Sequence, residues 1–214
     1  MNCYEDILRL GITAIIWICW CVSHSLLNIE GVVARILAPD SRIRPYYRLI
    51  YSIISAITLG LVYWVTPRYN DLPVLRWHGV FIAVKSAIWV VALAIGYLSF
   101  RFINIWDFLG LTAVGIGRKA RGTSDRLVTW GIYGEIRNPR FLAGLLLLWA
   151  RDLTCTGLVT NMVLSLYLIS GALIEEKRLV RKFGEEYVRY KSRVPRFIPR
   201  RLPPLRFLFG AQDR

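Results

Sequence analysis

The chain has 214 residues, of which 55% are hydrophobic, and it carries 28 lysines and arginines against 14 aspartates and glutamates. The apolar content excludes an intrinsically disordered protein, and so large an excess of positive charge is unusual for a soluble domain. Long uncharged runs alternate along the chain with short basic segments. This segregation predicts an integral membrane protein with basic loops on one side, rather than a nucleic-acid binder.

Three apolar runs in the first half of the chain predict membrane spans at about residues 10–27, 47–66 and 79–100. Each run is long enough to cross roughly 30 Å of hydrocarbon at about 1.5 Å per residue. The first run follows the acidic residues Glu5 and Asp6 and lacks the basic region that opens a signal peptide. We therefore expect it to be retained as a span.

The last apolar stretch predicts a helical hairpin. Apolar residues run from 141 to 149, Arg151 and Asp152 interrupt them, and they resume from 158 to 174. The first helix of this hairpin, about 13 residues or roughly 20 Å, is too short for a perpendicular span. We expect it either to stop below the far surface or to pack against its neighbours.

The distribution of lysine and arginine predicts the orientation of the chain. The connection 28–48 and the segment 101–140 are strongly basic, as is the tail after Ile174, whereas the loop 67–78 contains only Arg68 and Arg76. The positive-inside rule then places the N-terminus outside and the C-terminus in the cytoplasm, in the plasma (inner) membrane. The predicted fold is an all-α integral membrane bundle of about five transmembrane helices with a C-terminal helical hairpin and a cytoplasmic helical tail. We expect a single domain over 1–214, with the transmembrane part at about 10–174 and the tail at 175–214.

Two of the predicted cytoplasmic segments are richer in polar and aromatic residues than topology requires. One, at 128–141, leads into the short hairpin, and the other, at 174–190, leaves it. A hairpin returns the chain to the side that it left, so residues 137–141 are predicted to lie near residues 175–179.

The motifs in these segments resemble a known family. They are Gly-x-Tyr at 131–133, Arg-Asn-Pro-x-Phe-x-x-Gly at 137–144, Glu-Glu-x-x-Leu-x-x-x-Phe-Gly-x-x-Tyr-x-x-Tyr at 175–190, and Val-Pro-x-x-x-Pro at 194–199. In this order they resemble the isoprenylcysteine carboxyl methyltransferases and the bacterial phospholipid methyltransferases. The segments 23–27, 47–51 and 107–111 are similar to the bacterial methanethiol S-methyltransferase branch. The resemblance covers most of the chain.

The resemblance implies an S-adenosylmethionine-dependent methyltransferase that releases S-adenosylhomocysteine. Chemically, Arg137 could hold the cofactor's carboxylate, and Glu175 or Glu176 its ammonium or its ribose hydroxyls. The catalytic residues so implied are Arg137, Asn138 and Glu175. The cofactor-binding residues so implied are Gly131, Ile132, Tyr133, Arg137, Asn138, Phe141, Leu142, Glu175, Glu176 and Tyr187.

Two residues depart from the family pattern. Asn138 stands where the family usually has histidine, and Phe141 stands where it has tyrosine. The Asn138 amide can still donate and accept hydrogen bonds, but it cannot titrate as an imidazole does. An acceptor that is already ionised, such as a thiolate or a carboxylate, would need no general base at this position.

Simpler interpretations of the same residues remain open. Glu175 and Arg178 have the spacing of a surface ion pair, Arg137 could be a basic membrane anchor, and Asn138-Pro139 suits a helix start. We expect His24 to be a satisfied interfacial histidine rather than a catalytic one. His78 lies on the opposite side of the membrane, so the two histidines predict no metal site.

The predicted partners are membrane lipids and a small lipophilic acceptor, namely a thiol, a lipid amine or a carboxylate, with no nucleic acid. The basic tail at 193–206 is predicted to contact anionic lipid. The alternative function is a membrane protein that binds lipid without methylating it, or a relative of carotenoid-type isomerases.

Overall fold

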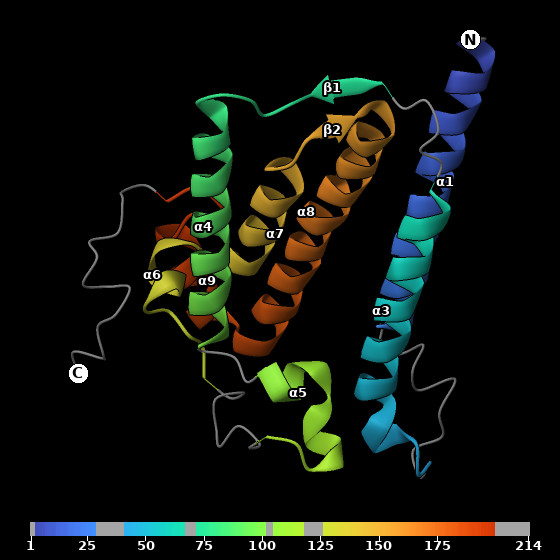
Figure 1. Ribbon diagram of the computed structural model, residues 1–214. Coiled ribbons are helices and arrows are strands. Elements are labelled where there is room, and N and C mark those ends of the chain that lie inside the picture. Colours follow the sequence, from blue (N-terminus) through green and yellow to red (C-terminus); the bar gives the residue numbers. More distant parts are fainter. Residues whose placement is uncertain (1–2, 29–40, 67–71, 102–104, 118–125, 200–214) are drawn as a thin grey trace. The chain divides into compact units, whose positions relative to one another are not determined.

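The computed structural model describes residues 3–28, 41–66, 72–101, 105–117 and 126–199, and in these ranges the protein is almost entirely helical (Figure 1). The all-α prediction is confirmed, with one small two-stranded sheet in addition. The elements in chain order are α1 (Cys3–Leu27), η1 (Arg44–Tyr46), α3 (Tyr47–Val65), β1 (Pro73–Leu75), α4 (Phe81–Phe100), α5 (Ile105–Leu109), η2 (Leu111–Val114), α6 (Ile132–Glu135), α7 (Pro139–Trp149), β2 (Leu153–Thr154), α8 (Cys155–Phe183) and α9 (Glu185–Arg193).

The chain forms two compact units. The first comprises residues 1–76, 104–120 and 152–164, and the second comprises residues 77–103, 121–151 and 165–214, so α8 begins in the first and ends in the second. This division by contacts does not test the prediction of a single domain, which stays a prediction.

Within the described residues, four helices are long and apolar enough to cross a membrane, namely α1, α3 (together with η1), α4 and α8. Apolar side chains cover their surfaces: no residue of α3 is buried, and Ile57 and Trp64 are strongly exposed. Such a helix requires an apolar surrounding. The chain is therefore a helical membrane protein. The fifth helix of the prediction, α7, has 11 residues and is short, as expected.

Helices α1 and α3 form a hairpin in the first unit, joined by polar side chains. His24 on α1 lies 2.8 Å from the Tyr51 hydroxyl through its Nε2 atom and 3.0 Å from Ser55 Oγ through its Nδ1 atom. The imidazole also stacks on Trp20, whose indole N–H donates to Thr58 Oγ1 at 3.1 Å. Polar groups in a membrane helix need such partners. The expectation of a satisfied histidine at position 24 is confirmed.

Two connections of the first unit are held by backbone contacts. Strands β1 and β2 pair antiparallel, which places the loop before α4 beside the turn between α7 and α8. Gly110, between α5 and η2, lies against the backbone of Arg48 and Leu49 at the start of α3. A Cβ at Gly110 would collide with the Leu49 nitrogen and stand 2.8 Å from the Arg48 carbonyl carbon. The chain segments predicted to share a side of the membrane therefore do lie side by side.

In the second unit, α7 packs along α4. The approach is close because small residues meet: a Cβ at Gly96 of α4 would be 3.9 Å from the Ala143 Cβ of α7. Two indoles satisfy the carbonyls at the end of α7, since Trp89 donates to Ala150 O at 2.6 Å and Trp77 donates to Arg151 O at 3.0 Å. The short helix thus packs against its neighbour, as one of the two expectations proposed.

Two helix bounds differ from the prediction. Helix α1 begins at Cys3 rather than at residue 10, because Glu5 and Asp6 favour a helix N-terminus and Asp6 pairs with Arg9 at 3.3 Å. Helix α8 continues nine residues past Ile174, because the charged residues that follow are strong helix formers. It ends at Phe183, and Gly184 follows with a φ of +54°, which suits glycine. Helix α8 therefore carries Glu175 and Glu176 within its regular body.

Candidate functional site

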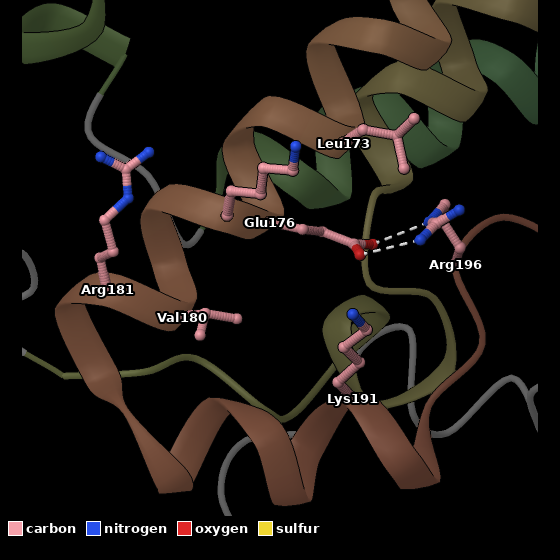
Figure 2. A pocket seen from close by; sticks show the side chains of 7 residues that line it. Leu173, Glu176, Val180, Arg181, Lys191 and Arg196 are labelled. Atoms are coloured by element: carbon pink, nitrogen blue, oxygen red, sulfur yellow. Dashed lines mark hydrogen bonds and ion pairs between the residues drawn. The ribbon is translucent and has the colours of Figure 1, made fainter.

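The centre of the site is the Glu176 carboxylate, which is 3% exposed and lies on α8. The Asn138 side-chain amide donates to its Oε1 atom at 2.7 Å. Arg196 donates to both oxygens, from Nε at 3.0 Å and from Nη2 at 3.1 Å (Figure 2). The Arg137 guanidinium completes the set at 3.4 Å from Oε2. Segments 38 and 20 residues away from Glu176 thus meet at one carboxylate.

Backbone hydrogen bonds hold the segment after α9 against the start of α7. The Arg137 N–H donates to Pro195 O at 2.9 Å, and the Asn138 N–H donates to Arg196 O at 3.1 Å. Asn138 is the N-cap residue of α7, and Pro139 follows in the first helical position, where proline is favoured. The Asn138 side chain does not cap the helix and is therefore free to reach Glu176.

Gly131 and the two tyrosines of α9, Tyr187 and Tyr190, determine how α6 and α9 are joined. Gly131 precedes α6 with φ of +61° and ψ of −138°, a region that is essentially restricted to glycine. The Tyr190 hydroxyl of α9 donates to the Tyr133 carbonyl at 2.6 Å, and the Tyr187 and Tyr190 rings meet edge to face at 5.6 Å. Helix α9 is thereby attached to α6.

Burial controls the ionisation of the three tyrosines. Desolvation, reinforced by the charge of Glu176, raises the pKa of Tyr187 to about 12, while Arg137 acts in the opposite direction. Desolvation also raises the pKa of Tyr190 and of Tyr133 above the usual range. All three hydroxyls are therefore neutral near pH 7 and act as hydrogen-bond groups rather than as bases. Hydrogen bonding to Glu176 raises the pKa of Arg196, which stays charged.

Two buried polar groups in the site lack hydrogen-bond partners among the described residues. The Tyr187 side chain is 1% exposed, yet its hydroxyl has no partner there. The Arg137 side chain is 7% exposed, and its Nε and Nη1 atoms make no hydrogen bond, although Nη1 lies within ion-pair range of Glu176. Buried polar groups are nearly always satisfied. Unused donors on a guanidinium and a phenol fit a ligand that carries a carboxylate and hydroxyl groups.

A cavity of about 370 Å³ adjoins the carboxylate. Leu173, Glu176, Lys177, Val180 and Arg181 of α8 line it, together with Lys191 of α9 and Arg196 (Figure 2). Among the ten residues predicted to bind the cofactor, Glu176 alone is in this lining. The other nine predicted cofactor residues therefore do not line this cavity.

The structure brings together several residues singled out from the sequence. Arg137, Asn138 and Glu176 are in contact, and Tyr187 lies within their electrostatic range. Glu175 influences the pKa of both Tyr133 and Tyr187 and is therefore close to the same group. The predicted proximity of residues 137–141 and 175–179 is confirmed.

Other predicted residues have packing roles in the structure. Ile132 and Leu142 belong to an apolar cluster with Leu98. The Phe141 ring contacts Gly171 of α8, where an added Cβ would stand 3.0 Å from Cε1. Their part in binding a cofactor stays a prediction.

Sequence reasoning missed Arg196. The sequence predicts only that Arg196 belongs to a basic tail in contact with lipid, whereas in the structure its guanidinium binds Glu176. The usable signal was the Val-Pro-x-x-x-Pro motif, which contains this single cation directly after a helix with two tyrosines. The part of that tail beyond Pro199 lies outside the described residues.

The fold and the site define a helical membrane protein with a buried cluster of charged and polar side chains from the start of α7, from α8 and from the segment after α9. The chain is similar to curated methanethiol S-methyltransferases. Methanethiol S-methyltransferase 1 of Bradyrhizobium diazoefficiens is 29% identical over 73% of this chain and 55% of that protein, and the Crocosphaera subtropica enzyme is 27% identical over 73% and 62%. The Pseudomonas deceptionensis enzyme is 26% identical over 79% and 64%.

These similarities confirm the resemblance to membrane methyltransferases of the methanethiol S-methyltransferase branch. The chain spans about 55–64% of the length of these curated relatives. No family model matches the chain, and no solved structure matches it.

Proposed function

We propose that this protein is a membrane methyltransferase that uses S-adenosylmethionine and methylates a small lipophilic thiol. The observation that carries the proposal is the buried Arg137, which lies beside Glu176 with unused donors, in a chain similar to methanethiol S-methyltransferases. The lipid amine and the carboxylate considered from the sequence are the other acceptor classes that an assay must include.

The residues present fit the cofactor's polar groups. Arg137 would hold the carboxylate through its fork of N–H donors, and the Tyr187 hydroxyl would donate to or accept from a ribose hydroxyl or the carboxylate. Glu175, which is only half-buried, would take the ammonium. Glu176 already accepts three hydrogen bonds and pairs with Arg137, so we assign it to orienting Arg137 and Asn138 rather than to holding the cofactor.

S-Adenosylmethionine, when bound, supplies an electrophilic methyl group on a sulfonium. Transfer to a thiol would replace the sulfonium–methyl bond by a bond between the methyl group and the acceptor sulfur, leave S-adenosylhomocysteine and release the thiol proton to solvent. The chain's own contribution is to fix the cofactor's carboxylate and exclude water, so that the acceptor meets the methyl group in line. The neutral tyrosines and the engaged Glu176 are poor bases, which favours an acceptor that ionises readily.

For the whole chain we propose the orientation predicted from the loops. The N-terminus would lie outside and the C-terminus in the cytoplasm of the plasma membrane, which places the Glu176 cluster at the cytoplasmic end of α8. The cofactor is made in the cytoplasm of any cell, so this orientation would give it direct access.

The test of the proposal is calorimetric titration of the detergent-purified full chain with S-adenosylmethionine and S-adenosylhomocysteine. We expect saturable binding by the wild type and at least about tenfold weaker binding by Arg137→Lys, because lysine keeps the charge beside Glu176 but lacks the planar fork. Arg178→Lys, a matched change of an exposed arginine on α8, is the control and should bind normally. Absence of binding in a folded sample would refute the proposal and favour the lipid-binding alternative.

A further inference from the structure

The cavity beside Glu176 has a strongly positive lining. Lys177 and Arg181 come from successive turns of α8, and Lys191 comes from α9 (Figure 2). The only carboxylate in the lining, Glu176, is shared by Arg196 and Arg137 and therefore leaves no negative charge to balance the other cations.

The three cations have no counter-ion in the part of the chain that the structure describes. Lys177, Arg181 and Lys191 take part in none of the ion pairs or hydrogen bonds found there. Like charges one helical turn apart, as at positions 177 and 181, are mildly destabilising on their own. An anion in the cavity would remove this repulsion, and phosphate is an anion that both lysine and arginine bind.

The same face of α8 continues from the cations into exposed apolar side chains. Positions 166, 169, 173, 177, 180 and 181 recur at intervals that place them on one face of a helix. Leu166, Ile169 and Leu173 are exposed, and Leu173 and Val180 also line the cavity. The cavity therefore lies where the apolar span of α8 meets its charged end, which is the level of lipid head groups.

We propose that this cavity binds the phosphate of an anionic phospholipid, with the acyl chains along the exposed apolar face of α8. Lys177, Lys191 and Arg181 hold the phosphate, and Leu173 contacts the upper part of an acyl chain. The paired Glu176 forms the wall between this lipid and the cluster of Arg137 and Asn138. The lipid site shares only Glu176 with the predicted cofactor residues, and the argument for it does not rest on the proposed function.

The test counts bound lipids by native mass spectrometry of the full chain in detergent. The probes are phosphatidylglycerol, phosphatidylcholine and inorganic phosphate. The cavity variant is Lys177→Gln/Arg181→Gln/Lys191→Gln, and the control is Arg178→Gln/Arg189→Gln/Arg193→Gln, which removes the same charge from exposed positions of α8 and α9 outside the cavity. We expect the wild type and the control to retain one phosphatidylglycerol, and the cavity variant to bind it at least about tenfold more weakly.

Several results would overturn the proposal. Equal losses in both triple variants would mean diffuse surface charge, and an unchanged cavity variant would mean that the cations are not ligands. Phosphate bound as tightly as phosphatidylglycerol would assign the site to a free anion. Displacement of the lipid by S-adenosylhomocysteine would assign the cations to the cofactor. If the triple variant does not fold, Lys191→Gln alone must lower phosphatidylglycerol affinity, with Arg189→Gln as its control.

Discussion

At the scale of single residues, the Glu176 carboxylate shows how one buried charge can organise three segments. Asn138 and Arg196 donate three hydrogen bonds to its two oxygens, and Arg137 adds an ion pair at 3.4 Å. Burying a carboxylate with fewer partners would cost free energy. Its contacts with the start of α7 and with the segment after α9 therefore stabilise the packing of these two segments against α8. The consequence is that Arg137 is held in place while part of its guanidinium stays available.

Substituting Arg196 measures how much its contact with Glu176 contributes to the stability of the protein. Arg196→Gln deletes two hydrogen bonds to a carboxylate that keeps Arg137 and Asn138, and the Arg196 side chain is 35% exposed. We expect a loss of about 1–2 kcal/mol in stability, or roughly 2–8 °C in the Tm of the detergent-solubilised protein. Arg193→Gln, at an exposed position of α9, should leave the Tm unchanged. An Arg196 variant as stable as the wild type would mean that this ion pair does not hold the segment.

Substitution of the two tyrosines of α9 by phenylalanine should affect stability and ligand affinity differently. Tyr187→Phe removes a buried hydroxyl without a partner in the described residues, so stability should change by less than about 0.5 kcal/mol. Its affinity for S-adenosylhomocysteine should nevertheless fall about five- to tenfold, since one ligand hydrogen bond is lost. Tyr190→Phe removes the bond to Tyr133 O and should cost about 1 kcal/mol in stability. Thermal melts and calorimetry of both variants check this, and a destabilised Tyr187→Phe with normal affinity would contradict it.

At the scale of elements, a contact between the start of α3 and the α5–η2 connection gives a structural role to two segments, 47–51 and 107–111, that the sequence analysis noted only for their resemblance to relatives. Gly110 has φ of +78° and lies against the Leu49 backbone. The segments 47–51 and 107–111 are therefore in direct contact, and glycine is required there by space as well as by conformation.

A pair of glycine substitutions tests this contact. Gly110→Ala should lower stability by more than about 2 kcal/mol, because alanine is strained at this φ and its Cβ would meet backbone atoms. Gly60→Ala, inside α3 with nothing within 4 Å of the new Cβ, should be neutral or stabilising by up to about 1 kcal/mol. Tm values of the two purified variants provide the comparison. Equal effects would mean that the close approach at Gly110 is not formed.

The long apolar helices could be predicted because their hydropathy determines them, whereas the short elements η1, β1, α5, η2, α6 and β2 have no such signal. Residues 47–66 and 79–100 predicted α3 and α4 to within two residues at each end. The continuation of α8 was missed because the apolar pattern ends where helix-forming charged residues begin. In the site, the predicted hairpin is enough to place Arg137 near Glu176. The ion pair between Arg196 and Glu176 depends on the path of the chain after α9, which no local sequence pattern indicates.

At the scale of the whole molecule, the two backbone contacts between connections each join segments of similar charge. The β1–β2 pairing joins two connections that are poor in basic residues, and the Gly110 contact joins two segments from the basic side. The Glu176 cluster lies at the charged end of α8, where twelve lysines and arginines follow Ile174. Charge thus gathers at the end of the chain that carries the proposed cofactor site.

The most direct measurement of the central claim is methyl transfer by the purified full chain. The donor is S-adenosylmethionine labelled in its methyl group, and the acceptors are a short alkyl thiol, a lipid amine and a prenylated carboxylate. We predict a labelled alkyl methyl sulfide from the wild type and from Arg178→Lys, and at least about tenfold less from Arg137→Lys. Label transferred to none of the acceptors, by a folded protein that binds the donor, would contradict the account.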